Sequence, residues 1–133
     1  MNAQELKECT AAWAIDTGRL ISPLFRSRET AHRASQIRDA ADSSASNYRA
    51  ACIARSHKEF VAKLSIALEE CDEAVGFLEM SHREGLVRGP EAMRVLDEGR
   101  QLTRILAKSR ETAQQNEGTS RKGKGRPQQE GAQ

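Results

Sequence analysis

Two pairs of residues in this chain have the spacing of a helical metal site. Glu29 and His32 form one Glu-x-x-His motif, and Glu79 and His82 form a second one. Di-iron helical bundles place one such motif on each of two helices and add inward glutamates from the other two. The two motifs lie at similar distances from a turn near residues 54–56, so antiparallel helices would bring them to one end of a bundle. Few glutamates are available to complete the site, and surface or capping roles are favoured for all four residues.

A second set of residues could bind phosphate groups or a partner protein. These candidates are Arg38, Arg49, Arg55 and Lys58, together with Arg121, Lys122, Lys124 and Arg126 near the C-terminus. Basic side chains neutralise phosphates, and such binding weakens as salt rises. No aromatic residue lies between the four C-terminal charges, so weak binding or a solubilising role is expected of them.

The charge distribution limits what the folded part of the chain can bind. The sequence holds 21 basic and 19 acidic residues, and residues 116–133 contain four of the basic and two of the acidic ones, which leaves 17 of each in residues 1–115. A neutral body disfavours nucleic-acid binding over the whole fold, because such proteins usually carry a basic patch. The acidic run Glu69, Glu70, Asp72 and Glu73 predicts a solvated or ion-pairing helix face, with Arg38 and Arg49 as expected partners.

Composition predicts an all-α protein. Hydrophobic residues make up 38% of the chain, charged residues 30% and aromatic residues only 4%, and the residue types that prefer strands are scarce. Apolar residues recur at spacings of three and four from about residue 2 to 21, and Ser22-Pro23 ends that helix. A second helix is expected from about residue 27 to the turn at 54–56, and Gly89-Pro90 predicts the start of a fourth helix that runs to Ala113.

The third helix carries the clearest pattern. Ser56 and Glu59 form a predicted capping box at its start. Its heptad row comprises Phe60, Leu64, Ala67, Cys71, Ala74 and Leu78. A flanking row of Val61, Leu68 and Val75 indicates that this helix meets more than one partner. Together with Trp13 and Tyr48, the residues Phe60, Leu64, Leu68 and Val75 are expected in the core or in a subunit interface.

These elements predict an antiparallel up-down-up-down four-helix bundle in residues 1–115, followed by a disordered basic tail in residues 116–133. The inward residues expected on the fourth helix are Met93, Leu96, Leu102, Ile105 and Leu106, and Gly99 is a weak point or a site of close approach. The three cysteines are expected to be reduced and mostly buried in a soluble, cytoplasmic protein without a membrane helix or secretory signal.

The segment 44–74, SASNYRAACIARSHKEFVAKLSIALEECDEA, resembles the signature stretch of the bacterial four helix bundle protein family. That family is related to proteins encoded by intervening sequences of large ribosomal RNA genes. The similarity is carried by the run from Asn47 to Ala51, the basic turn at Arg55 and the Glu59-Phe60 start of the next helix. The resemblance implies a four-helix bundle that in several relatives is a homopentamer, without an established biochemical activity for most members.

One branch similar in fold is the accessory variability determinant of diversity-generating retroelements, a basic pentamer that binds a reverse transcriptase and nucleic acid. The resemblance therefore implies a non-enzymatic, oligomeric adaptor or scaffold, with a pentamer favoured, which supports an RNA- or reverse-transcriptase-linked process. No cofactor and no small-molecule substrate are expected. Two alternatives stay open, a metal-binding bundle of the ferritin-like kind and a purely structural partner of an unknown client protein.

Overall fold

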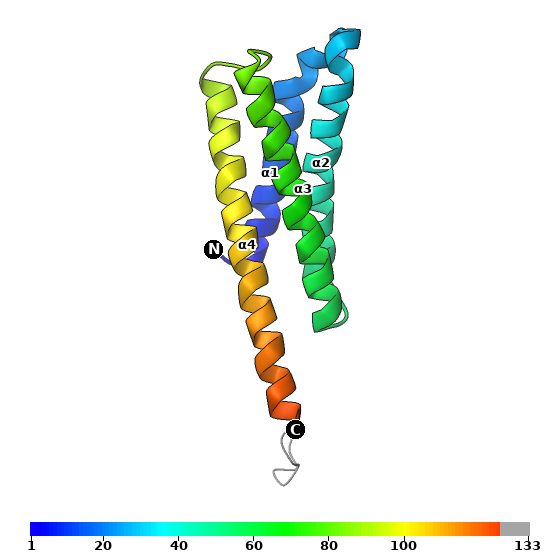
Figure 1. Cartoon of the computed structure of the whole chain (residues 1–133), viewed down its shortest axis with the longest axis vertical. Helices are drawn as coiled ribbons and strands as arrows, with labels where there is room; N and C mark the ends of the chain where they lie inside the picture. The colour runs from blue at the N-terminus through cyan, green and yellow to red at the C-terminus, as the bar shows by residue number, and fades with distance from the viewer. Residues whose placement is uncertain (126–133) are drawn as a thin grey trace.

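The computed structural model describes the backbone of residues 1–125 and the side chains of residues 1–116. Within that range the chain forms α1 (Ala3–Ile21), a short 3-10 helix η1 (Ser22–Arg26), α2 (Arg28–Cys52), α3 (His57–Arg83) and α4 (Pro90–Gly125), and it contains no strand. The four long helices lie side by side, and successive helices run in opposite directions (Figure 1). The all-α four-helix prediction is confirmed. None of the described helices is long and apolar enough to cross a membrane.

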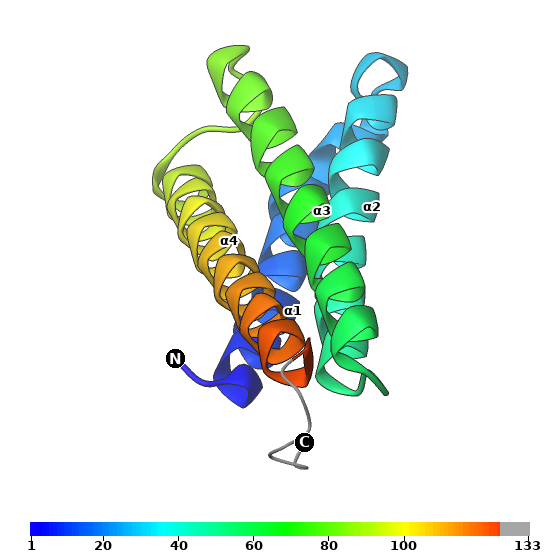
Figure 2. The same ribbon diagram turned by 60° about the horizontal axis from the view of Figure 1, so that its bottom comes forward.

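The order of the helices around the bundle decides which seams exist. α1 packs against α2 and α4, and α3 packs against the same two helices from the other side (Figure 2). The α2/α3 seam is fixed near its upper end, where Arg33 donates a hydrogen bond to Glu84 at 2.7 Å. The α1/α4 seam is fixed near its middle, where the indole of Trp13 donates to the carbonyl of Val95 at 2.9 Å.

Side chains close to the helix ends explain where the helices start. The hydroxyl of Ser56 accepts the N–H of Glu59 at 3.0 Å, which caps α3 as predicted. Glu59 does not complete the expected capping box, because its carboxylate accepts the N–H of Arg55 at 3.2 Å and not that of Ser56. A complete capping box occurs instead at the start of α1, between Asn2 and Glu5.

The connection from α3 to α4 depends on two glycines. Gly85 and Gly89 have φ angles of +78° and +93°, a backbone region that residues with a Cβ rarely adopt. Gly85 follows the end of α3, and Gly89 stands directly before Pro90, the first residue of α4. The glycine and proline signals in the sequence therefore correspond to real helix ends.

Both apolar rows of α3 are buried within a single chain. In the heptad row, Leu64, Ala67, Cys71, Ala74 and Leu78 are buried, and Leu68 and Val75 of the flanking row are buried as well. Ser81, one heptad after Ala74, receives a hydrogen bond from Arg33 of α2. Val75 lies against the backbone of Gly99 in α4. The two rows therefore face two helices of the same bundle, and they are not by themselves a sign of a second subunit.

Three sequence expectations about helix ends and faces need correction. Met93 was expected to point inward, but it is 40% exposed, and Ala92 and Val95 fill the core at that level. Leu96, Leu102 and Leu106 are buried as expected, so Met93 alone was assigned to the wrong face. The fourth helix does not end at Ala113 but continues to Gly125, so residues 116–125 are helical where disorder was expected. A helix that has already formed gains one backbone hydrogen bond per added residue, and no proline interrupts this one before position 127. Residues 126–133 lie outside the described part.

The cysteines are less buried than expected. Only Cys71 is buried, whereas Cys9 and Cys52 are exposed. Cys71 lies in the core beside α4, where burial raises the pKa of its thiol to about 11, against a smaller lowering by the hydroxyl of Thr103. Cys52 is the last residue of α2, and no helix covers it. Cys9 lies on α1 at the border with α4.

Candidate functional site

The predicted metal residues do not form a site. Glu29 and His32 are exposed, and the carboxylate of Glu79 accepts a hydrogen bond from Arg100 at 2.9 Å. His82 lies on α3 at the upper end of the bundle, as the sequence indicated. Among the residues whose side chains are described, no group of three or more histidine, cysteine, aspartate or glutamate side chains could hold a metal ion. Correct spacing and a shared end of the bundle were therefore insufficient, and the ferritin-like hypothesis is set aside.

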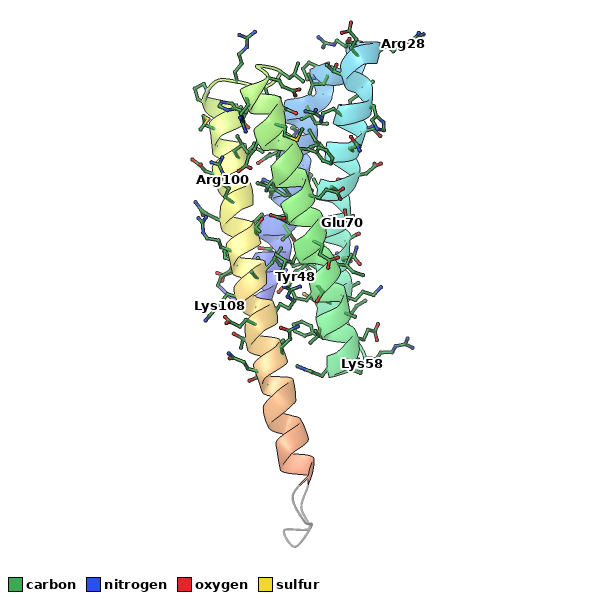
Figure 3. The ribbon with its side chains drawn as sticks, in the orientation of Figure 1. Arg28, Tyr48, Lys58, Glu70, Arg100 and Lys108 are labelled. Atoms are coloured by element: carbon green, nitrogen blue, oxygen red, sulfur yellow. The ribbon has the colours of Figure 1, made fainter. Side chains whose placement is uncertain are left out.

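The predicted basic contacts separate into two places. Arg49, Arg55 and Lys58 are exposed around the turn between α2 and α3. In Figure 3, Lys58 marks this turn at the lower end of the bundle, the same end from which α4 projects beyond the other helices. The backbone positions of Arg121, Lys122 and Lys124 are on that projecting part of α4, their side chains are outside the described set, and Arg126 lies outside the described residues altogether.

Arg38 does not belong to this basic end. Its guanidinium stacks over the ring of Phe25 at 4.3 Å from the ring centroid. This contact helps to hold η1 against α2. Neither Arg38 nor Arg49 forms an ion pair with the acidic run of α3 within the described side chains. Partial burial and then the neighbouring carboxylates, Glu73 first, raise the pKa of Glu70. The expected pairing is therefore wrong, and this acidic face is uncompensated.

The residues predicted for the core or an interface are in the core. Trp13, Tyr48, Leu64, Leu68 and Val75 are buried, and Phe60 is half-buried and packs on the same cluster. Figure 3 shows Tyr48 among the helices in the interior of the bundle. Burial, followed by the neighbouring Cys52, raises the pKa of the Tyr48 phenol to about 12, so this phenol stays protonated at physiological pH.

A groove with a mostly apolar lining lies between α1 and α4, and sequence reasoning missed it. Its cavity volume is about 330 Å³, at the lower end of the range for ligand pockets. Its lining includes Cys9, Ala12, Trp13, Gln101, Leu102 and Ile105. These residues come from segments some 90 positions apart in the sequence, so no local pattern could have revealed the groove.

Trp13 holds the two sides of the groove in place. Its indole N–H donates to the carbonyl of Val95, and its ring lies directly against Gly99. A Cβ at position 99 would stand 2.7 Å from Cζ2 of Trp13 and 2.8 Å from Cγ2 of Val75. Gly99 is thus a site of close approach, as the sequence suggested. The large indole keeps α1 and α4 apart at this level, and the groove opens beside it.

A cluster of charges forms the rim of the groove. Arg94 of α4 donates hydrogen bonds to Asp16 of α1 at 3.2 Å, to Glu98 at 2.8 Å and to Glu91. The hydrogen bond from Arg94 lowers the pKa of Glu91, and the three carboxylates raise the pKa of Arg94. Three carboxylates share one guanidinium, so this cluster keeps a net charge of two negative units, of which Glu91, outside the lining of the groove, contributes one. These groups satisfy one another, which is typical of a binding surface more than of a catalytic centre.

Several large apolar side chains are exposed. Met1 (71%) lines the groove, Ile15 (55%) and Met93 (40%) are on the helices that border it, and Ile53 (78%) is at the α2–α3 turn. Single exposed apolar residues are common on protein surfaces. Ile53 could have been noticed in the sequence, because it stands alone among the basic residues of a turn.

The comparisons with known proteins agree with this architecture. The model of the family described as 23S rRNA-intervening sequence protein matches residues 7–108. A crystal structure of a protein of unknown function from the S23 ribosomal protein family of Bacteroides thetaiotaomicron VPI-5482 superposes with a TM-score of 0.75. It is 22% identical, and the match covers 84% of this chain and 99% of that one. No curated protein matches the chain. The family match spans most of the bundle, and the chain belongs to the family of 23S rRNA-intervening sequence proteins.

Proposed function

We propose that this protein is a non-enzymatic adaptor or scaffold that works as a homo-oligomer. The observation that carries the proposal is the α1/α4 groove, which offers an apolar floor beneath a rim whose charged groups are already engaged with one another. Such a surface fits a protein segment, since apolar cores with polar rims are the usual anatomy of protein interfaces. A pentamer is the favoured state because of the resemblance noted in the sequence.

The oligomer is tested by sedimentation velocity and native mass spectrometry of the full chain at micromolar concentrations. We expect one discrete assembly of about five subunits. A chain that stays monomeric throughout this concentration range overturns the scaffold proposal. Another discrete stoichiometry keeps the scaffold and removes the pentamer.

We further propose that the scaffold supports an RNA- or reverse-transcriptase-linked process in the cytoplasm. One observation favours a nucleic-acid contact over a purely structural role. α4 directs the basic segment from Arg121 to Lys124 away from the neutral bundle. A projecting basic helix can reach a phosphate backbone without bringing the acidic face of α3 close to it.

The nucleic-acid contact is tested by fluorescence anisotropy with a labelled single-stranded RNA at several salt concentrations. The full chain is compared with a variant in which Arg121, Lys122 and Lys124 are changed to glutamine. We expect salt-dependent binding that is weaker in the variant. The slope of the logarithm of the affinity against the logarithm of the salt concentration should be smaller by about two to three. Equal binding by both proteins would move the contact away from α4, and no binding by either would leave only the protein scaffold.

A further inference from the structure

The most exposed large apolar side chain in the described part of the chain is Ile53, at 78%. It stands at the turn between α2 and α3, directly after the last residue of α2. No helix of its own bundle covers this position. The turn is held by backbone hydrogen bonds from Ile53 to Ala50 and from Ala54 to Ala51, both at 3.2 Å, so Ile53 is presented on an ordered turn.

Three basic residues lie within five positions of Ile53 in the sequence. Arg49, Arg55 and Lys58 are exposed, and the half-buried Glu59 follows Lys58, which leaves a net charge of two positive units. Arg55 is paired weakly, because its guanidinium stands 3.8 Å from Glu59 and its side chain is 92% exposed. The turn therefore combines one apolar projection with cations that are free to find other partners.

The α1/α4 groove has the complementary properties. Ala12 and Ile105 give it accessible apolar surface above the buried Trp13. Among its lining residues, Asp16 and Glu98 pair with Arg94, which leaves one negative charge in excess, and Glu91 beside the groove adds another. An apolar side chain flanked by cations suits such a site in both shape and charge. The turn joins α2 and α3, whereas the groove lies between α1 and α4, so a chain cannot place its own Ile53 in its own groove (Figure 2).

We propose that the α2–α3 turn of one copy docks into the α1/α4 groove of the next copy. Ile53 rests on Ala12 and Ile105, and the cations of the turn lie against Asp16 and Glu98. This inference rests on the oligomer proposed above and names the surfaces that build it. The contact joins two different surfaces, so it is head-to-tail, and a series of such contacts closes into a ring when the rotation between copies permits.

The two exposed native cysteines report on this contact directly. Cys9 lines the groove and Cys52 precedes Ile53, while Cys71 is buried. A short bismaleimide added to the assembled wild-type protein is expected to join Cys9 of one copy to Cys52 of the next, and peptide mapping identifies the pair. Cys9→Ser and Cys52→Ser should each abolish the cross-linked ladder. Predominant Cys9–Cys9 or Cys52–Cys52 products would overturn the head-to-tail pairing.

Substitution of the anchor gives a second, independent readout. Ile53→Asp should raise the concentration at which the assembly half-dissociates by about tenfold or more, as expected for a residue at the centre of an interface. Because Ile53 is almost fully exposed in the single chain, circular dichroism should show an unchanged helix content. The matched control is Ile66→Asp, which changes an exposed isoleucine of α3 outside both surfaces and should leave the assembly intact.

The outcomes separate this inference from the broader proposal. A discrete oligomer that is insensitive to Ile53→Asp and gives no Cys9–Cys52 product keeps the scaffold but overturns the pairing of turn and groove. A wild-type monomer removes both. Loss of RNA affinity in Ile53→Asp without any change in mass would assign the turn to nucleic acid and would also overturn the pairing.

Discussion

The α2/α3 seam and the α1/α4 seam differ in the size of the side chains that fill the space between the two helices. On α2, Ala40 lies one heptad after Arg33, and on α3, Ala74 lies one heptad before Ser81, the residue that Arg33 contacts, so small side chains face each other across the seam. In the α1/α4 seam one indole fills the space, pressed against the bare backbone of Gly99. At the level of Ala40 and Ala74, small residues on both sides allow α2 and α3 to approach closely. One large residue closes the α1/α4 seam at a single level and leaves a groove beside it.

Charge follows the same division. Beside the α1/α4 groove, three carboxylates share the guanidinium of Arg94, and the pKa of Glu91 is lowered by its hydrogen bond to that group. On α3, the acidic run has no ion pair within the described side chains, and the pKa of Glu70 is raised. The acidic run of α3 thus keeps its charges unpaired, whereas the carboxylates beside the groove share a guanidinium.

The largest effect is expected from Trp13→Ala. The indole is buried and holds α1 on α4, so its removal should lower the free energy of unfolding by about 3–5 kcal/mol. Urea unfolding followed by circular dichroism measures this change, since Trp13 is the single tryptophan and its fluorescence is lost. Ile15→Ala on the exposed side of α1 is the control and should change little. A loss below about 1 kcal/mol for Trp13→Ala would mean that the seam depends on other contacts.

Ala74→Leu tests the α2/α3 seam. Extra methylene groups in a well-packed core cost about 1–3 kcal/mol, because neighbouring side chains must leave their preferred rotamers. Ala74 is buried, whereas Ala62 on the same helix is exposed, so Ala62→Leu is the matched control. Thermal unfolding should show a lower Tm for Ala74→Leu alone. Equal stability of the two variants would show that α2 and α3 have room between them.

Gly99→Ala tests the close approach of Trp13 to the backbone of α4 by adding one methyl group. The added Cβ would collide with Trp13 and Val75, which costs about 1–3 kcal/mol, and the helix propensity of alanine returns up to about 1 kcal/mol. A net loss of about 1–2 kcal/mol is expected. At Gly76 of α3 a Cβ meets nothing within 4 Å, so Gly76→Ala should stabilise the protein. Urea midpoints that move in the same direction for both variants would contradict the close approach.

The smallest effects concern pH. The folded-state pKa of Glu70 is raised, so its ionised form disfavours the fold, and stability increases as pH falls through that raised pKa. Glu70→Gln should therefore raise Tm slightly at pH 7, and this advantage should vanish in acid. The pKa of Glu91 is lowered, so Glu91→Gln should lower Tm at pH 7, with the loss disappearing as pH falls through its depressed pKa. If Tm at pH 7 changed in the same direction in both variants, the two carboxylates would not differ in their effect on stability.

The helix starts could be predicted from sequence because their signals are local. Pro23, the cap at Ser56 and Gly89-Pro90 act within a few residues, and the structure places helix ends there. The phase of a helix is harder to predict, because one residue shifts a face by about 100°. Met93 was placed on the wrong side for this reason. Cys9 was expected to be buried because free cysteines usually are, and it is exposed.

The candidate site could not be predicted for a different reason. The groove exists only where α1 meets the early part of α4, and the decisive pairs join residues about 80 positions apart, such as Trp13 with Val95 and Asp16 with Arg94. No single stretch of sequence carries such a pair. The Glu-x-x-His motifs show the converse, since their spacing was suitable and their side chains nevertheless do not converge.

The length of α4 gives the groove a mechanical link to a distant point. Leu102 lines the groove and Gly125 ends the same uninterrupted helix, which places them about 35 Å apart at 1.5 Å per residue. Ala113 is still buried in the bundle, so the part of α4 that extends beyond it is about 18 Å long. A tilt of about 5° at Ala113 would move the end of α4 by about 1.6 Å.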